Sequence, residues 1–152
     1  MKRLAMLLGF GLFVISFAAS AADDDLAALE TARALWQMAQ DGDYRFRYQK
    51  YCDCDRNEPK VTVVSVANGQ ISSVHHLIND SDREVPAREG SLSEYWTMED
   101  LFEKIAAAYA RDAAVRVQFD DRNGNPSSIY IDYLPDMVGD ETDLRGIAFE
   151  LR

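Results

Sequence analysis

Residues 44–54 read Tyr-Arg-Phe-Arg-Tyr-Gln-Lys-Tyr-Cys-Asp-Cys and carry the clearest strand signal in the chain. Aromatic residues at 44, 46 and 48 alternate with two arginines and a glutamine, and side chains two residues apart in a strand share a face. One face of this strand is therefore predicted to join a hydrophobic core, and the other to carry a basic, solvated row. The alternation breaks before Cys52 and Cys54, the only two cysteines of the chain.

The N-terminus is predicted to be a secretory signal peptide spanning residues 1–21. Two basic residues precede an apolar run from Leu4 to Phe17, and small residues follow up to the predicted cleavage after Ala21. The apolar run is too short to favour a membrane span. We expect an exported protein, periplasmic or secreted, whose residues 22–152 form a single domain.

The composition is strongly acidic. The chain has 16 basic and 26 acidic residues and a formal net charge of −10 at pH 7, and removing the leader with its two basic residues lowers this to −12. Such a surface repels phosphate groups, so nucleic acid is not an expected partner. The acidity favours solubility. A protein or a small molecule remains the expected partner.

Two amphipathic helices are predicted. The first begins near three aspartates and carries apolar residues at helical spacing up to Gly42, where a glycine favours helix termination; its predicted apolar positions are Leu26, Leu29, Ala32, Trp36 and Ala39. The second begins with a capping box formed by Thr97 and Asp100 and ends near Arg111.

The remaining patterns predict antiparallel strands. A valine-rich run at residues 61–66 is followed by Asn68-Gly69, a strong hairpin signal, and by a return strand. A second hairpin turns at residues 120–126, and residues 147–151 alternate as a final strand. The polar segment 79–93 is predicted to be a surface connection. The chain is thus α+β, with a largely antiparallel sheet of about five or six strands and two helices packed on one face.

These motifs together resemble a family of bacterial exported domains of unknown function, the domain of unknown function 6174 type. The resemblance rests on the tyrosine-rich strand ending in Cys-x-Cys, the hairpin at Gly69, the Leu101-Phe102 helix, and Gly124-x-Pro126-x-x-Ile followed by Asp140-Glu141. It runs from about residue 36 to residue 151. It implies export, one domain and a paired Cys-x-Cys, but no activity. Asn125 departs from the aromatic residue expected there.

The Cys52/Cys54 pair has three open interpretations. An even number of cysteines in an oxidising compartment favours a disulfide that acts as a local staple. A bridge between residues two apart requires a bent backbone and closes almost no loop, so it adds little stability, and a strained bridge would suit thiol exchange. The pair could also join His75 or His76 in a soft metal site, although adjacent histidines point to opposite faces of a strand.

Other chemistry is weakly indicated. Asp121, Asn123 and Asn125 imitate the start of a calcium loop, but Pro126 replaces the glycine that this loop requires. A solvated loop is the favoured interpretation of the acidic group Asp132, Asp136, Asp140, Glu141 and Asp143. No nucleophile elbow, zinc-protease motif, phosphate loop or dinucleotide fingerprint occurs.

We therefore predict a non-catalytic, exported binding or accessory protein without a cofactor or resident metal, whose free sheet face or edge takes a ligand or a protein strand. The alternative is a thiol-redox or thiol-metal protein that uses Cys52 and Cys54. The aromatic residues Tyr95, Trp96 and Trp36 are predicted to belong to the core.

Overall fold

The computed structural model describes residues 21–51, 61–78, 83–88, 90–134, 136–137 and 139–151. This part of the chain forms one sheet with two α-helices and one short 3₁₀ helix. In chain order the elements are α1 (Ala21–Ala39), β1 (Tyr44–Tyr51), β2 (Val61–Ala67), β3 (Gln70–Leu77), β4 (Glu84–Pro86), η1 (Leu92–Glu94), α2 (Met98–Tyr109), β5 (Ala114–Phe119), β6 (Pro126–Asp132) and β7 (Thr142–Leu151).

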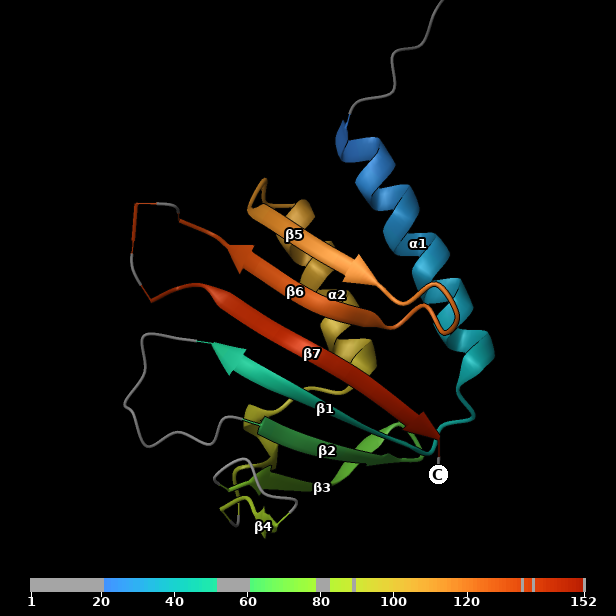
Figure 1. Cartoon of the computed structure of the whole chain (residues 1–152). Coiled ribbons are helices and arrows are strands. Elements are labelled where there is room, and N and C mark those ends of the chain that lie inside the picture. The colour runs from blue at the N-terminus through green and yellow to red at the C-terminus, as the bar shows by residue number, and fades with distance from the viewer. Residues whose placement is uncertain are drawn as a thin grey trace, which may run out of the picture.

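The seven strands form a sheet in the order β4-β3-β2-β1-β7-β6-β5, and every neighbouring pair is antiparallel. Each helix is followed by a run of strands joined to their chain neighbours, and the two runs meet where β1 pairs with β7 (Figure 1). The predicted α+β class, antiparallel pairing and two helices are confirmed. The sheet has one strand more than the upper end of the expected number.

Two strand predictions need correction. Segment 79–93, expected to lack regular structure, contains β4 and η1. The final strand begins at Thr142 instead of residue 147. Its alternation is interrupted because Gly146 adopts a φ of +60° and the pairing of β1 with β7 shifts register nearby. Leu144 and Ile147 are consequently both buried although they are three residues apart.

The helices bury most of the positions that their spacing predicts, and Ala39 at the end of α1 is half-buried. Leu29, Ala32 and Trp36 of α1 are buried, whereas Leu26 is exposed because the first turns of α1 project past the sheet (Figure 1). The start of α2 has the predicted capping box: the amide of Asp100 donates to Thr97 Oγ1, and the Asp100 carboxylate accepts from the amide of Thr97. No described helix is long and apolar enough to cross a membrane.

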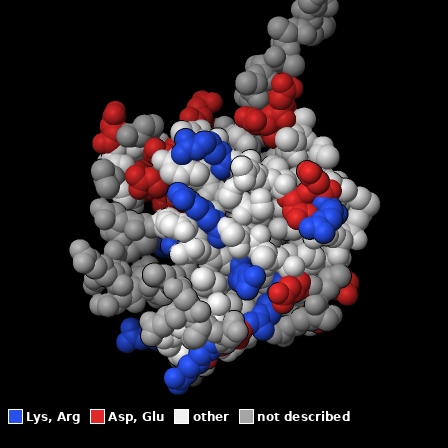
Figure 2. All heavy atoms as spheres, in the orientation of Figure 1, with Lys and Arg blue, Asp and Glu red and all other residues white. Residues whose placement is uncertain are grey.

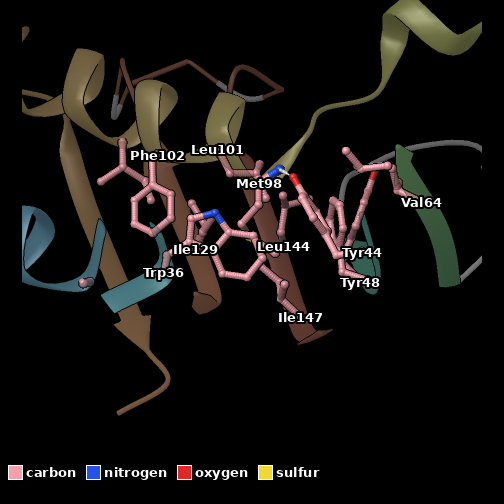
Figure 3. Packing of buried hydrophobic residues seen from close by; sticks show 14 of the residues in the cluster. Trp36, Tyr44, Tyr48, Val64, Met98, Leu101, Phe102, Ile129, Leu144 and Ile147 are labelled. Atoms are coloured by element: carbon pink, nitrogen blue, oxygen red, sulfur yellow. Dashed lines mark hydrogen bonds between the residues drawn. The ribbon is translucent and has the colours of Figure 1, made fainter. Parts of the chain in front are cut away.

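The core lies between the helices and the Tyr44, Phe46 and Tyr48 face of β1, which is buried as predicted. The Trp36 ring meets the rings of Tyr44 and Phe149 edge-on, with centroids 5.0 and 4.7 Å apart. Figure 3 shows Trp36 within this cluster and the Tyr44 hydroxyl accepting from the amide of Met98, at 3.0 Å. Rings from α1, β1 and β7 thus link the first helix to the centre of the sheet.

Candidate binding site on the open face of the sheet

The face of the sheet opposite the helices carries the candidate site. Alternation along β1 places Arg45, Arg47, Gln49 and Tyr51 on this open face, because Tyr44, Phe46 and Tyr48 lie against the core. Directly paired residues of neighbouring strands share a face. The pairing of Tyr51 with Asp143, Asp143 with Tyr130, and Tyr130 with Arg116 therefore sets one transverse row across β1, β7, β6 and β5.

Two arginines in this area lie over tyrosine rings. Arg116 Cζ is 4.1 Å from the centroid of Tyr130, and Arg145 Cζ is 4.3 Å from that of Tyr51. At exposed sites such a contact contributes about 0.5–1 kcal/mol. Each contact also limits the freedom of a long side chain, so both guanidinium groups are held near the sheet instead of extending into solvent.

Asp143 further orients Arg145. Its two carboxylate oxygens accept from Arg145 Nε and Nη2, at 3.0 and 2.7 Å. The hydrogen bond to Asp143, together with the charge of that carboxylate, raises the pKa of Arg145 above its already high value, so this group stays cationic. Tyr51 completes the cluster by donating to Gln49 Oε1 at 2.9 Å.

The other half of the open face is partly closed by its own side chains. Arg45 of β1 forms an ion pair with Glu84 of β4, and this contact bridges two intervening strands. Beneath it Val63 and Ser65 are buried although they face away from the helices. Arg47 is exposed and has no ion-pair partner among the described residues.

The open face differs in charge from most of this acidic molecule. Figure 2 shows Lys and Arg side chains along the middle of the face and most of the visible acidic groups toward its rim. Arg116, Arg145, Arg47 and Arg45 lie on this face. A partner that docks here therefore meets arginine and tyrosine side chains, of which Arg45 and Arg145 are paired with Glu84 and Asp143.

A hollow also lies on the helix side, toward the C-terminal end of β1. It is lined by Tyr48, Lys50, Thr62, His76, Glu94, Tyr95 and Trp96. His76 Nε2 lies 3.0 Å from the Tyr95 hydroxyl, and Nδ1 lies 3.4 Å from Thr62 Oγ1. Its polar groups thus bond to one another between β2, β3 and Tyr95, the residue that follows η1. Burial raises the pKa of Tyr48 to about 12, so this phenol is neutral at physiological pH.

The raised pKa of the Tyr48 phenol predicts that the free energy of unfolding falls in alkali. Its ordinary pKa is 10.0 and its folded value is about 12, so its contribution is complete below pH 10 and is lost as the pH rises through 12. The loss from this group is roughly 2 kcal/mol. Denaturant unfolding gives the free energy of unfolding at each pH. Between pH 9 and pH 12 this free energy should fall less steeply for Tyr48→Phe than for the wild type. Tyr51→Phe, which removes an exposed phenol, is the control, and equal slopes for Tyr48→Phe and wild type would contradict the prediction.

Comparison with known proteins places the chain in a family. A model of a family of unknown function (DUF6174) matches residues 28–149. The chain belongs to this family. The match covers most of α1 and nearly all of the sheet. No curated protein and no solved structure matches the chain.

The cysteine pair on which the sequence interpretations centre cannot be placed in this DUF6174 fold. Cys52 and Cys54 lie outside the described residues, so their pairing, exchange and metal chemistry stay predictions. His75 and His76 do occupy opposite faces of β3, as predicted: His75 pairs with Val63 on the open face, and His76 points toward Tyr95 on the helix side. Both are half-buried.

The acidic residues have mainly local roles. Asp132 accepts from the amide of Leu134 and from the hydroxyl of Tyr130, at 3.1 and 3.3 Å, which caps a turn as expected. In the turn that imitates a calcium loop, Asn125 is buried, and Asp120 accepts from the amide of Arg122. Within the described ranges no three His, Cys, Asp or Glu residues gather closely enough to hold a metal ion.

The aromatic residues follow the predictions only in part. Trp36 is a core residue, whereas Tyr95 and Trp96 are half-buried and line the helix-side hollow. The contacts of Arg116 with Tyr130 and of Arg145 with Tyr51 were missed by sequence reasoning. Alternation in the DUF6174 sequence indicates the face on which each residue lies, but not that β7 is the neighbour of β1.

Proposed function

We propose that this protein is an exported, non-catalytic binding or accessory protein that holds its partner on the open face of the sheet. The observation that carries the proposal is the pair of guanidinium groups stacked on tyrosines on the face that neither helix covers. Tyrosine and arginine dominate the binding energy of protein interfaces, and here they are already held in place.

The chemistry of the side chains on the open face supports binding of a partner and not catalysis. Arginine side chains stay protonated and donate in a fixed geometry, so they bind carboxylates well but do not exchange protons. Tyr51 and Asp143 are engaged by Gln49 and Arg145. The predicted leader at residues 1–21 supports a periplasmic or secreted location.

Site-specific photocrosslinking in the exporting bacterium tests this function. A photoreactive residue replaces Ser128, which lies on the open face between Gln118 and β7, or the exposed Ala107 of α2 as the matched control. We expect a discrete adduct from position 128 only, and its loss when Arg47→Ala and Arg145→Ala are combined. The captured partner is then purified.

Calorimetry with the purified partner gives the second readout. Removing both arginines should weaken binding at least about ten-fold, as expected for interface residues of this type. Equal adducts from positions 128 and 107, or an adduct and an affinity that survive the loss of both arginines, would contradict a binding role for the open face.

A further inference from the structure

The two edges of the sheet are protected unequally. At one edge β4 has three residues and ends in Pro86, and both features limit pairing with another strand. At the other edge β5 has six residues, contains no proline, and has β6 as its single neighbour in the described part of the chain. Every second residue of such an edge strand directs its backbone N–H and C=O away from the sheet, where they can pair with an added strand.

A hollow surrounds the β5 edge and is lined from both faces. Val115 and Val117 border it on the helix side together with Tyr109 and Asp25, and Arg116, Gln118 and Tyr130 border it on the open side. Both valines are half-buried. A space that continues from one face of an edge strand to the other is the space that a further strand would occupy.

We propose that β5 accepts an extended segment of a partner protein as an eighth strand, with a carboxylate beside Arg116 and apolar side chains over Val115 and Val117. The inference rests on the proposed function and names the kind of partner. Backbone hydrogen bonds give such an added strand its affinity, and alternate side chains give it specificity.

The charge of Arg116 favours an acidic residue of the partner segment on the open side. Arg116 is exposed, lies over Tyr130 and has no ion-pair partner among the described residues. Asp143 also borders the hollow on the open side, but its carboxylate is paired with Arg145. On the helix side Asp25 borders the hollow and disfavours a carboxylate there. The preferred segment therefore alternates acidic residues toward the open face with apolar residues toward the helices.

A second copy of this chain fits the edge less well. β5 reads Ala-Val-Arg-Val-Gln-Phe and has no acidic residue, so its copy would offer Arg116 only an alanine, an arginine or a glutamine. Two molecules that each carry a net charge of −12 without the predicted leader also repel each other. These two facts favour a segment of another protein.

Fluorescence anisotropy with defined peptides tests the proposal. The probe is a labelled eight-residue peptide that alternates valine with glutamate, titrated to about 1 mM, the range of weak complexes, into the full chain without its predicted leader. We expect saturable binding that Arg116→Glu weakens about ten-fold. Arg88→Glu makes the same charge change at an exposed site beyond β4 and should leave the affinity unchanged.

Two further probes separate strand addition from simple charge attraction. A valine–lysine peptide should bind the Arg116→Glu variant better than the wild type. Methylation of all the backbone nitrogens in the glutamate peptide should abolish binding, because it removes the backbone donors that an added strand requires.

Four results would overturn the proposal: no saturable binding of the glutamate peptide, equal binding of its N-methylated form, equal affinity of wild type and Arg116→Glu, or self-association through β5 that excludes the peptide. These results are separable from failure of the proposed function. If the crosslink at position 128 still depends on Arg47 and Arg145 while the peptide fails, only the β5 inference falls.

Discussion

Replacing Gly124 by alanine is expected to lower the free energy of unfolding by about 3 kcal/mol or more. Gly124 has a φ of +74° at the end of the β5–β6 hairpin, and an added Cβ would lie 2.1 Å from the carbonyl oxygen of Ala32 and 2.7 Å from the amide nitrogen of Trp36. Both are backbone atoms of α1 and cannot rotate away. The left-handed conformation costs roughly 1–2 kcal/mol, and overpacking adds about 1–3 kcal/mol.

Gly69→Ala is the matched control for this prediction. Gly69 has nearly the same φ, +73°, but an added Cβ would meet nothing within 4 Å. Its substitution should therefore cost only the conformational part, about 1–2 kcal/mol. Both variants are compared by urea unfolding, and equal losses would show that the contact between hairpin and helix is not the cause.

Replacing Trp36 by alanine is expected to cost about 3–5 kcal/mol, the usual range for truncating a large buried aromatic residue. Only 1% of Trp36 is exposed, and its ring meets Tyr44 and Phe149 edge-on. Its Nε1 also donates to Glu99 Oε1 at 2.9 Å, which ties α1 to the first turn of α2. One substitution thus weakens contacts among α1, α2, β1 and β7.

Far-UV circular dichroism should follow this unfolding, because the substitution removes one of only two tryptophan fluorophores. Met38→Ala, on the same helix but at a residue that is 76% exposed, is the control and should change stability by less than about 0.5 kcal/mol. Trp36→Phe keeps a ring but loses the bond to Glu99, so its cost should fall between the two. A loss for Trp36→Ala no larger than that for Met38→Ala would mean that α1 does not contribute to the core.

The structure also shows why single residues of the candidate site were hard to predict. Tyr51 was expected at the end of the first strand, and Arg145 precedes residue 147, where the final strand was expected to begin. They meet because β7 begins earlier than its alternation indicates and pairs with β1. Similarly, nothing in the order of residues indicates that Gly124 touches Ala32, since the contact depends on how the second hairpin meets the first helix.

The sequence by itself determined the local parts of this protein: the aromatic face of β1, the helical spacing of α1 and α2, the capping box at Thr97, and the turn at Asn68-Gly69, whose φ angles of 52° and 73° suit asparagine and glycine. Each depends on forces acting over a few residues, namely side-chain periodicity, steric limits on the backbone and hydrogen bonds within a turn.

Only the tertiary structure decided that β1 and β7 are neighbours and that β5 remains an outer strand. These features depend on how the whole chain buries its apolar surface, because many pairings of the same strands satisfy the local rules. The contact of Arg145 with Tyr51 follows from that choice, since the two residues come from β7 and β1, which are far apart in the chain.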